Sequence, residues 1–197
     1  MSWPNRITVL RLLMVPVFVL LLLNAAGNPA YRYAAMGLAV IIGVCDAADG
    51  IIARRTGSVT RIGSILDPLA DKAMMISALV TMSIEGILSS RYPNLGVPTW
   101  AAVALVSRDL FILIGTVIVF LLVGMFQARP SLTGKAATVM QFVSILFTLA
   151  TPDLVAGAPD LTWWSLRILW GVTVALGLVS WLGYIRTGSK LLAAGAE

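Results

Sequence analysis

The sequence predicts an all-α polytopic membrane protein with six transmembrane helices and both termini in the cytoplasm. Of its 197 residues, 59% are hydrophobic and 12% are charged, and the mean hydropathy is +0.94, too apolar for a soluble domain. Clusters of turn residues divide the chain into six apolar segments, so we expect one integral-membrane domain over residues 1–197. The expected helices are roughly 5–24, 31–54, 64–88, 97–125, 132–151 and 163–186.

The basic residues set the predicted orientation. Of the 14 Lys and Arg residues, Arg108 falls within a span, and Arg32, Arg91 and Arg167 fall at one set of helix ends. Cytoplasmic loops are enriched in Lys and Arg, so the opposite set of ends should be cytoplasmic, and the acidic loop with Asp153 and Asp160 should lie outside. The remaining ten basic residues fall at those cytoplasmic ends: Arg6, Arg11, Arg54, Arg55, Arg61, Lys72, Arg129, Lys135, Arg186 and Lys190.

The first segment has basic residues before an apolar run, as a secretory signal peptide does. Arg11 lies well inside the segment, however, and no clean small-residue cleavage site follows it. We therefore expect a retained helix. Asn5, Thr8 and Arg11 recur at a spacing of three and share one helical face, where they either help to hold a nucleotide or its diphosphate or form a helix cap with a snorkelling arginine.

The second and third segments carry the most informative pattern, Asp-x2-Asp-Gly-x2-Ala-Arg-x8-Gly-x3-Asp-x3-Asp, between Asp46 and Asp71. A carboxylate at membrane depth is costly unless it is neutralised. Helical spacing gathers the fixed positions on two faces, which predicts a site for the hard cations Mg²⁺ or Mn²⁺. The faces hold Asp46, Asp49, Gly50 and Ala53 on the second helix, and Gly63, Asp67 and Asp71 on the third.

Such a site suits displacement at a diphosphate, because two metal ions about 3.5–4 Å apart clamp phosphate oxygens and stabilise the leaving group. Small residues beside the carboxylates would let a nucleotide approach the backbone. The chain has no histidine, so a carboxylate is the natural base for an acceptor hydroxyl. Two alternatives stay open. One is a cation transporter, since intramembrane acids often mark ion paths, and the other is a set of salt bridges to Arg54, Arg55, Arg61 and Lys72.

The later segments offer weaker candidates. Arg108-Asp109 lies inside the fourth segment and is either an internal charge pair or, through Arg108, a phosphate-binding group. Arg129 and Lys135 flank the start of the fifth segment and are either ordinary cytoplasmic residues or parts of an acceptor phosphate pocket with Arg108. Gln141, nearly on the face of Thr133, is a weaker candidate still.

Several conspicuous residues are assigned no chemistry. A single cysteine, Cys45, excludes an internal disulfide and a cysteine metal cluster, and we expect it to pack. The net charge of +5 fits basic cytoplasmic ends facing anionic lipid, so we expect membrane lipids and no nucleic acid as partners. We expect interfacial or helix-packing roles for Trp163, Trp164, Trp170 and Tyr184.

The Asp46–Asp71 pattern resembles the signature of the CDP-alcohol phosphatidyltransferase family and matches it at every fixed position. The family resemblance implies attack of an acceptor hydroxyl on the β-phosphorus of CDP-diacylglycerol, release of CMP, two bound metal ions and a homodimer. It implies that Asp46, Asp49 and Asp67 are metal ligands, and that Asp71 is a ligand that also acts as the general base or lies beside it. The implied nucleotide-binding residues are Asn5, Thr8, Asp49, Gly50, Ala53, Arg54 and Gly63.

The acceptor is less defined by the residues. The Leu66–Lys72 stretch, like the Pro-Asn-x2-Thr-x2-Arg start, resembles the branch of phosphatidylglycerolphosphate and cardiolipin synthases. Glycerol-3-phosphate enzymes of this branch usually carry Arg-Glu in the fourth helix and a second arginine two turns later. Here Arg108-Asp109 is followed by no basic residue from Leu110 to Phe120. We therefore favour phosphatidylglycerol slightly, with glycerol-3-phosphate almost level, at an active site on the cytoplasmic face of the inner or plasma membrane.

Overall fold

The computed structural model describes the backbone of residues 3–56, 63–123 and 132–194, and side chains from 10–45, 72–115, 117–118 and 132–185. Within these ranges the chain is helical, as the sequence predicts, and contains no strand. The helices are α1 (Trp3–Leu23), α2 (Pro29–Thr56), α3 (Gly63–Met82), α4 (Thr99–Val123), α5 (Leu132–Leu154) and α6 (Pro159–Ala194), with the short 3₁₀-helix η1 (Pro93–Leu95).

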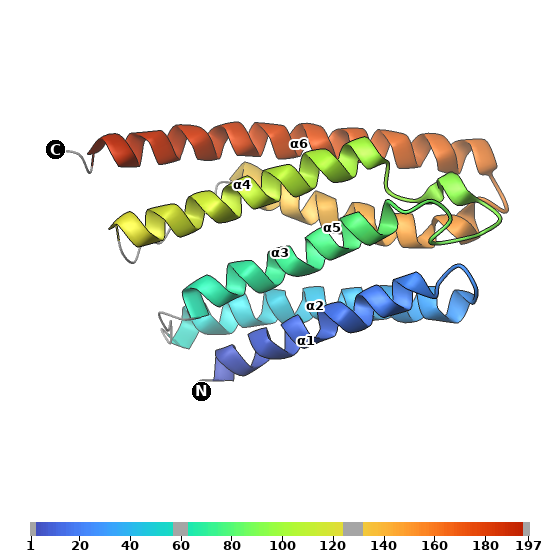
Figure 1. Ribbon diagram of the computed structural model, residues 1–197, viewed down its shortest axis with the longest axis horizontal. Helices are drawn as coiled ribbons and strands as arrows, with labels where there is room; N and C mark the ends of the chain where they lie inside the picture. Colours follow the sequence, from blue (N-terminus) through green and yellow to red (C-terminus); the bar gives the residue numbers. More distant parts are fainter. Residues whose placement is uncertain (1–2, 57–62, 124–131, 195–197) are drawn as a thin grey trace.

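Successive helices run in opposite directions along one bundle (Figure 1). The start of α1 and the end of α6 therefore lie at the same end, which we call the terminal end. The end of α2 and the start of α3 also lie there. The other end, which we call the opposite end, holds the connections 24–28, 83–98 and 155–158.

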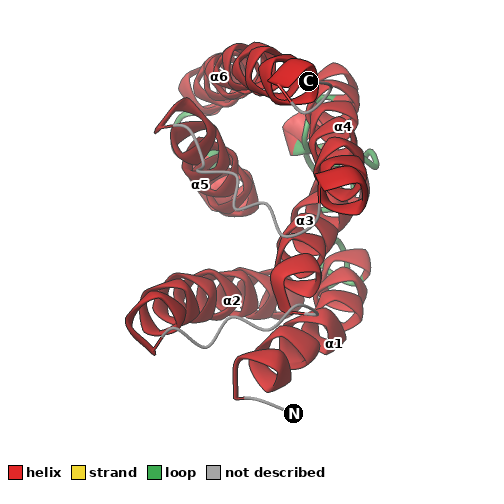
Figure 2. Ribbon diagram, turned by 90° about the vertical axis from the view of Figure 1, so that its left-hand side faces the viewer, coloured by secondary structure: helices red, strands yellow, loops and turns green. Residues whose placement is uncertain are grey.

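In cross-section, α1, α3, α4 and α6 form one curved row, and α5 and α2 lie on its inner side (Figure 2). The contacts follow this order: α1 packs against α2 and α3, α3 against α4, and α4 against α6. The helix α5 packs most extensively against α6 and also contacts α2 and α3. It is thus in contact with both helices that carry the aspartate pattern.

Small residues allow the helices to approach closely. In α2, Ala35 and Ala39 are fully buried on the face that also buries Ile42. Lipid is as apolar as leucine, so close packing and hydrogen bonds between helices hold such a bundle together. At Gly43 of α2 an added Cβ would lie 2.7 Å from the end of the Phe142 ring of α5, so a larger residue here would require the ring or the helix to shift.

Helix α3 ends at Met82, so its expected continuation to residue 88 is wrong. The chain turns at Gly86, whose φ is +72°, and returns so that the Val97 amide donates to the Met82 carbonyl at 2.8 Å. Ile87 and Leu88 in the turn are buried in the core. The apolar run was misleading because these turn residues pack inside the protein rather than extending the helix.

Helix α5 continues through Pro152 to Leu154, so its expected end at residue 151 is wrong, and Asp153 lies on a helix rather than in a loop. Proline cannot donate a hydrogen bond to the carbonyl four residues earlier. That carbonyl, of Thr148, accepts the Thr151 hydroxyl at 2.7 Å instead. The side chain of Arg32 in α2 also donates to the Leu149 carbonyl at 2.8 Å, so the backbone polar groups around the proline are satisfied.

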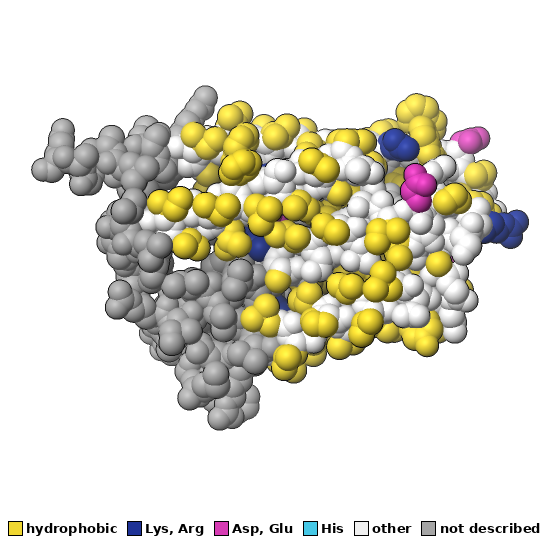
Figure 3. All heavy atoms as spheres, in the orientation of Figure 1, with side chains coloured by type: hydrophobic (Ala, Val, Ile, Leu, Met, Phe, Trp, Pro, Cys, Tyr) yellow, Lys and Arg dark blue, Asp and Glu magenta, His cyan; other side chains and the backbone are white. Residues whose placement is uncertain are grey.

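The described helices have the composition of a membrane protein. Three helical stretches, Pro93–Gly115, Leu132–Leu154 and Pro159–Ile185, are long and apolar enough to cross a membrane. Shorter apolar stretches occur in α1, α2 and α3 within the described part of the chain. Hydrophobic side chains cover the described face along its length, the visible acidic groups lie near the opposite end, and basic groups are visible both there and midway along the bundle (Figure 3).

One side-chain expectation needs correction, and another is confirmed. Cys45 is exposed rather than packed. Trp170 is completely buried, and its Nε1 donates to Thr148 Oγ1 at 3.1 Å, so it has the helix-packing role, one of the two roles expected for it. Trp164 is 60% exposed, as an interfacial residue would be.

Candidate functional site

The aspartate pattern occupies the terminal end of two helices. Asp46 and Asp49 belong to the last half of α2, and Asp67 and Asp71 to the first half of α3. Because α2 finishes and α3 begins at the terminal end, the backbone brings the two pairs to the same end of the bundle (Figure 1). The side chains of these four aspartates lie outside the described residues, as do those of Asn5, Thr8, Gly50, Ala53, Arg54 and Gly63.

Next to this pattern, a buried polar cluster joins four helices. Its centre is Asp109 of α4, which is completely buried. Oδ1 of Asp109 accepts hydrogen bonds from Arg108 Nη1 at 2.6 Å and from Lys72 Nζ at 3.2 Å, and Oδ2 accepts one from Gln141 Nε2 at 3.1 Å. Arg108 Nη2 donates to Ser180 Oγ of α6 at 3.1 Å. We call Lys72, Arg108, Asp109, Gln141 and Ser180 the Asp109 cluster.

The burial of this cluster explains its connectivity. A carboxylate removed from water is strongly unfavourable unless charged or polar donors surround it. Asp109 has such donors from α3, α4 and α5. Gln141 is the donor to Oδ2, so its removal would leave that buried oxygen without this partner, whereas Oδ1 has two donors. The cluster therefore links these three helices through one buried carboxylate.

Arg108 is 4% exposed and directed into the protein. Its Nη1 donates to Asp109 and its Nη2 donates to Ser180. Of its side-chain nitrogens, only the buried Nε has no hydrogen-bond partner among the described residues. The geometry is therefore that of the internal charge pair, the first of the two interpretations of Arg108-Asp109. Its binding of an acceptor phosphate stays a prediction.

The other acceptor candidates are not gathered around Arg108. Lys135 is exposed in the first turn of α5, and Arg129 lies outside the described residues. Gln141 is 1% exposed and joins Arg108 through Asp109. The sequence alone did not indicate Lys72 or Ser180 as members of a buried polar cluster. Lys72 directly follows Asp71 in the sequence, but no pattern indicated that its side chain would reach the fourth helix.

The described side chains contain no group of three or more Asp, Glu, His or Cys residues able to hold a metal ion. The predicted ligands lie beyond those side chains, so the metal prediction stays open. Their chemistry fits Mg²⁺ or Mn²⁺, because four carboxylates on two helix ends supply only oxygen ligands.

A second ion pair lies at the opposite end. Arg32, 3% exposed in α2, donates through Nη2 to Asp153 Oδ1 of α5 at 2.6 Å, and the Tyr33 hydroxyl donates to the same oxygen at 3.0 Å. This pair ties α2 to α5 far along the helices from the aspartates. We assign it a structural role.

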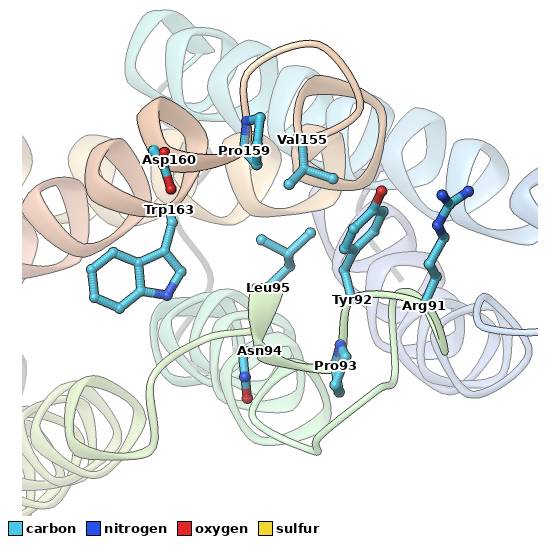
Figure 4. A pocket seen from close by; sticks show the side chains of 9 residues that line it. All are labelled: Arg91, Tyr92, Pro93, Asn94, Leu95, Val155, Pro159, Asp160 and Trp163. Atoms are coloured by element: carbon cyan, nitrogen blue, oxygen red, sulfur yellow. The ribbon is translucent and has the colours of Figure 1, made fainter.

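A shallow cavity of about 290 Å³ also lies at the opposite end, between η1 and the start of α6 (Figure 4). Arg91 and Asn94 line it on one side, and Asp160 and Trp163 line it on the other. None of the candidate site residues lines this cavity. The cavity and the aspartate pattern therefore lie at different ends of the bundle.

Comparison with known proteins decides what the aspartate pattern represents. A family model described as CDP-alcohol phosphatidyltransferase matches residues 1–179. The chain belongs to the CDP-alcohol phosphatidyltransferase family. The match includes α1 to α5 and most of α6, so the whole bundle, and not the motif alone, carries the similarity.

Named relatives of this phosphatidyltransferase fall into two groups. A Mycobacterium bovis protein named as a cardiolipin synthase is 30% identical over 86% of this chain and 75% of its own length. A CDP-diacylglycerol–glycerol-3-phosphate 3-phosphatidyltransferase of Pseudomonas fluorescens is 32% identical over 94% of this chain and 89% of its own. A protein of the same name from Aquifex aeolicus is 29% identical over 98% of both chains.

These similarities confirm the predicted family and place this phosphatidyltransferase among membrane enzymes of phospholipid biosynthesis. They give no support to the cation transporter alternative. The two groups of relatives carry different enzyme names, so they do not decide between phosphatidylglycerol and glycerol-3-phosphate as the acceptor of this chain.

Proposed function

We propose that this protein transfers the phosphatidyl group of CDP-diacylglycerol to a hydroxyl of a glycerol-based acceptor and releases CMP. The observation that carries the proposal is the complete aspartate pattern on α2 and α3, with both halves at the terminal end of the bundle. Family membership supplies the donor class.

We further propose that all six helices cross the membrane and that the terminal end is cytoplasmic. The distribution of Lys and Arg supports this orientation. Arg32, Arg91 and Arg167 belong to the half of the bundle toward the opposite end, as the orientation requires. The soluble CMP product would then leave directly into the cytoplasm. The family resemblance also leads us to propose a homodimer.

Two Mg²⁺ or Mn²⁺ ions, when bound, would neutralise the diphosphate oxygens and stabilise the departing CMP. Asp46, Asp49, Asp67 and Asp71 would hold them, and the small residues Gly50, Ala53 and Gly63 would leave room for the cytidine nucleotide. Arg54, at the end of α2, would support the diphosphate. Asn5 and Thr8, in the first half of α1, would contact the nucleotide from a third helix.

Asp71 would accept the proton of the acceptor hydroxyl as its oxygen attacks the β-phosphorus of CDP-diacylglycerol. A new phosphorus–oxygen bond to the acceptor forms, and the bond from the β-phosphorus to the oxygen bridging to CMP breaks. CMP takes the electron pair of that bond. The products are a phosphodiester-linked lipid, CMP and one proton.

For the acceptor we propose phosphatidylglycerol first and glycerol-3-phosphate second. A free phosphate dianion requires several unengaged cations, whereas a phosphodiester requires fewer. The internal bonds of Arg108 to Asp109 and Ser180 favour the phosphodiester. Lys135 and Arg129 remain the candidates that would contact either acceptor from the start of α5.

The test is a panel of acceptors offered to the purified protein in liposomes that contain CDP-diacylglycerol. We expect CMP release only when Mg²⁺ or Mn²⁺ and a glycerol-based acceptor are present, with the lipid product identified by mass. Cardiolipin as the main product would support phosphatidylglycerol, and phosphatidylglycerolphosphate would support glycerol-3-phosphate. Absence of CMP release with every glycerol-based acceptor would refute the proposed reaction.

A further inference from the structure

Helix α5 holds the two aspartate-bearing helices through two neighbouring residues. Gln141 donates from α5 to Asp109 Oδ2, and the other oxygen of Asp109 accepts the ammonium of Lys72 on α3. Phe142, the next residue of α5, packs against the backbone of α2 at Gly43. Consecutive helical residues point about 100° apart, so Gln141 can contact α4 while Phe142 contacts α2.

These contacts lie close to the aspartates along each helix. Lys72 follows Asp71 directly, and the helical rise is about 1.5 Å per residue. Gly43 precedes Asp46 by three residues, or about 4.5 Å along α2. A shift or rotation of either helix at these contacts would therefore be transmitted to the backbone positions that carry the carboxylates.

We propose that Asp109 and Gln141 are positioning residues of the transfer reaction, which together with the Gly43–Phe142 contact set the spacing between the two aspartate pairs. The inference rests on the proposed function, because the spacing matters only if the pairs share metal ions. Neither residue is required to touch substrate. Their effect reaches the site through Lys72 on one side and α2 on the other.

The physical basis is the narrow tolerance of a two-metal site. Mg²⁺ demands nearly ideal octahedral geometry with short bonds to oxygen, so ligands on separate helices must be held at a fixed separation. Asp109 is suited to this task because it is fully buried and bonded from α3, α4 and α5 at once. Residues that orient metal ligands without binding the metal commonly change metal affinity by about 10–100-fold when replaced.

The test is Gln141→Leu, which keeps the approximate side-chain size and removes the amide donor to Asp109. Mn²⁺ binding is measured on the detergent-solubilised protein from the loss of the free-ion electron paramagnetic resonance signal, independently of turnover. We expect a roughly tenfold weaker Mn²⁺ affinity. We expect the same direction, and a larger change, for Asp109→Asn.

Thr173→Val is the matched control. It removes the 2.7 Å hydrogen bond between Ser144 and Thr173, which joins α5 to α6 and involves neither aspartate helix. We expect it to lower thermal stability and to leave Mn²⁺ affinity unchanged. If Gln141→Leu and Asp109→Asn lower stability but bind Mn²⁺ like the unmodified protein, the positioning role is wrong and the cluster only stabilises the bundle.

A second pair of variants acts from the α2 side and decides the question if Gln141→Leu gives no folded protein. Gly43→Ala would place a Cβ 2.7 Å from the end of the Phe142 ring, so the ring, α2 or both must shift, and we expect weaker Mn²⁺ binding that is recovered when Phe142→Leu is added. Unchanged binding in Gly43→Ala, with a thermal stability below that of the unmodified protein, would overturn the inference. An unmodified protein that releases CMP with metal confirms the proposed function whatever the variants do, and one that neither binds Mn²⁺ nor releases CMP refutes both.

Discussion

The ammonium group of Lys72 in α3 donates a hydrogen bond to the buried carboxylate of Asp109 in α4 at 3.2 Å. Lys72 directly follows Asp71, the predicted general base. The fourth helix, which contributes no residue to the aspartate pattern, is therefore fixed to the third helix at the edge of that pattern. This contact connects the chemistry expected at the terminal end to the packing of the bundle.

Asp71→Asn should give a folded protein that still binds nucleotide but turns over very slowly. Asparagine keeps the size of the side chain and cannot take the proton of the acceptor hydroxyl, and loss of a general base slows a reaction by about 10²–10⁴-fold. CMP release and CMP binding, measured on the same preparation, check this. Turnover close to that of the unmodified protein would show that Asp71 is not the base.

Removal of divalent metal should abolish turnover reversibly. The predicted site consists of carboxylates only, so a chelator should stop CMP release, and added Mg²⁺ or Mn²⁺ should restore it. Asp46→Asn should raise the metal concentration needed for half-maximal rate. Full activity in excess chelator, with the protein's metal content shown to be negligible, would contradict the two-metal proposal.

Arg108→Gln distinguishes the two interpretations of Arg108. If this side chain binds the acceptor, the variant should show a higher KM for the acceptor, about tenfold or more, with the KM for CDP-diacylglycerol unchanged. If it is only the buried partner of Asp109 and Ser180, thermal stability should fall and both KM values should stay the same. Arg167→Gln, on the half of α6 toward the opposite end, is the control and should change neither KM value.

Trp170→Phe should destabilise the bundle without altering substrate affinity. Trp170 is completely buried, and its indole donates to Thr148 at 3.1 Å, far along α5 and α6 from the terminal end. Loss of this hydrogen bond between membrane helices should cost about 0.6–1.7 kcal/mol, with a further cost for the space left by the smaller ring. Denaturant unfolding in detergent measures the loss. The exposed Trp164→Phe should have little effect, and equal destabilisation of the two variants would contradict the packing role of Trp170.

The local elements could largely be predicted from the sequence. Apolar length and turn residues predict the helices, and the boundaries of α1, α2 and α4 agree with expectation within two residues. The sixth helix, expected at 163–186, is longer at both ends, since α6 is Pro159–Ala194. The errors at the ends of α3 and α5 share a cause, because packing and hydrogen bonding override local signals there. Buried turn residues extended the apolar run past Met82, and Thr151 with Arg32 satisfied the backbone around Pro152.

The sequence by itself determined the family, through the fixed positions of the aspartate pattern. It also determined which aspartates share a helix face, because helical periodicity places Asp46 with Asp49, and Asp67 with Asp71, whatever surrounds them. It offered Asp109 as a partner of Arg108 in only one of two interpretations, and it left Gln141 without a partner. Only the tertiary structure joined them with Lys72 around Asp109, since these residues come from three helices and are up to 69 positions apart. Such contacts depend on which helices become neighbours, and no local pattern of residues records that choice.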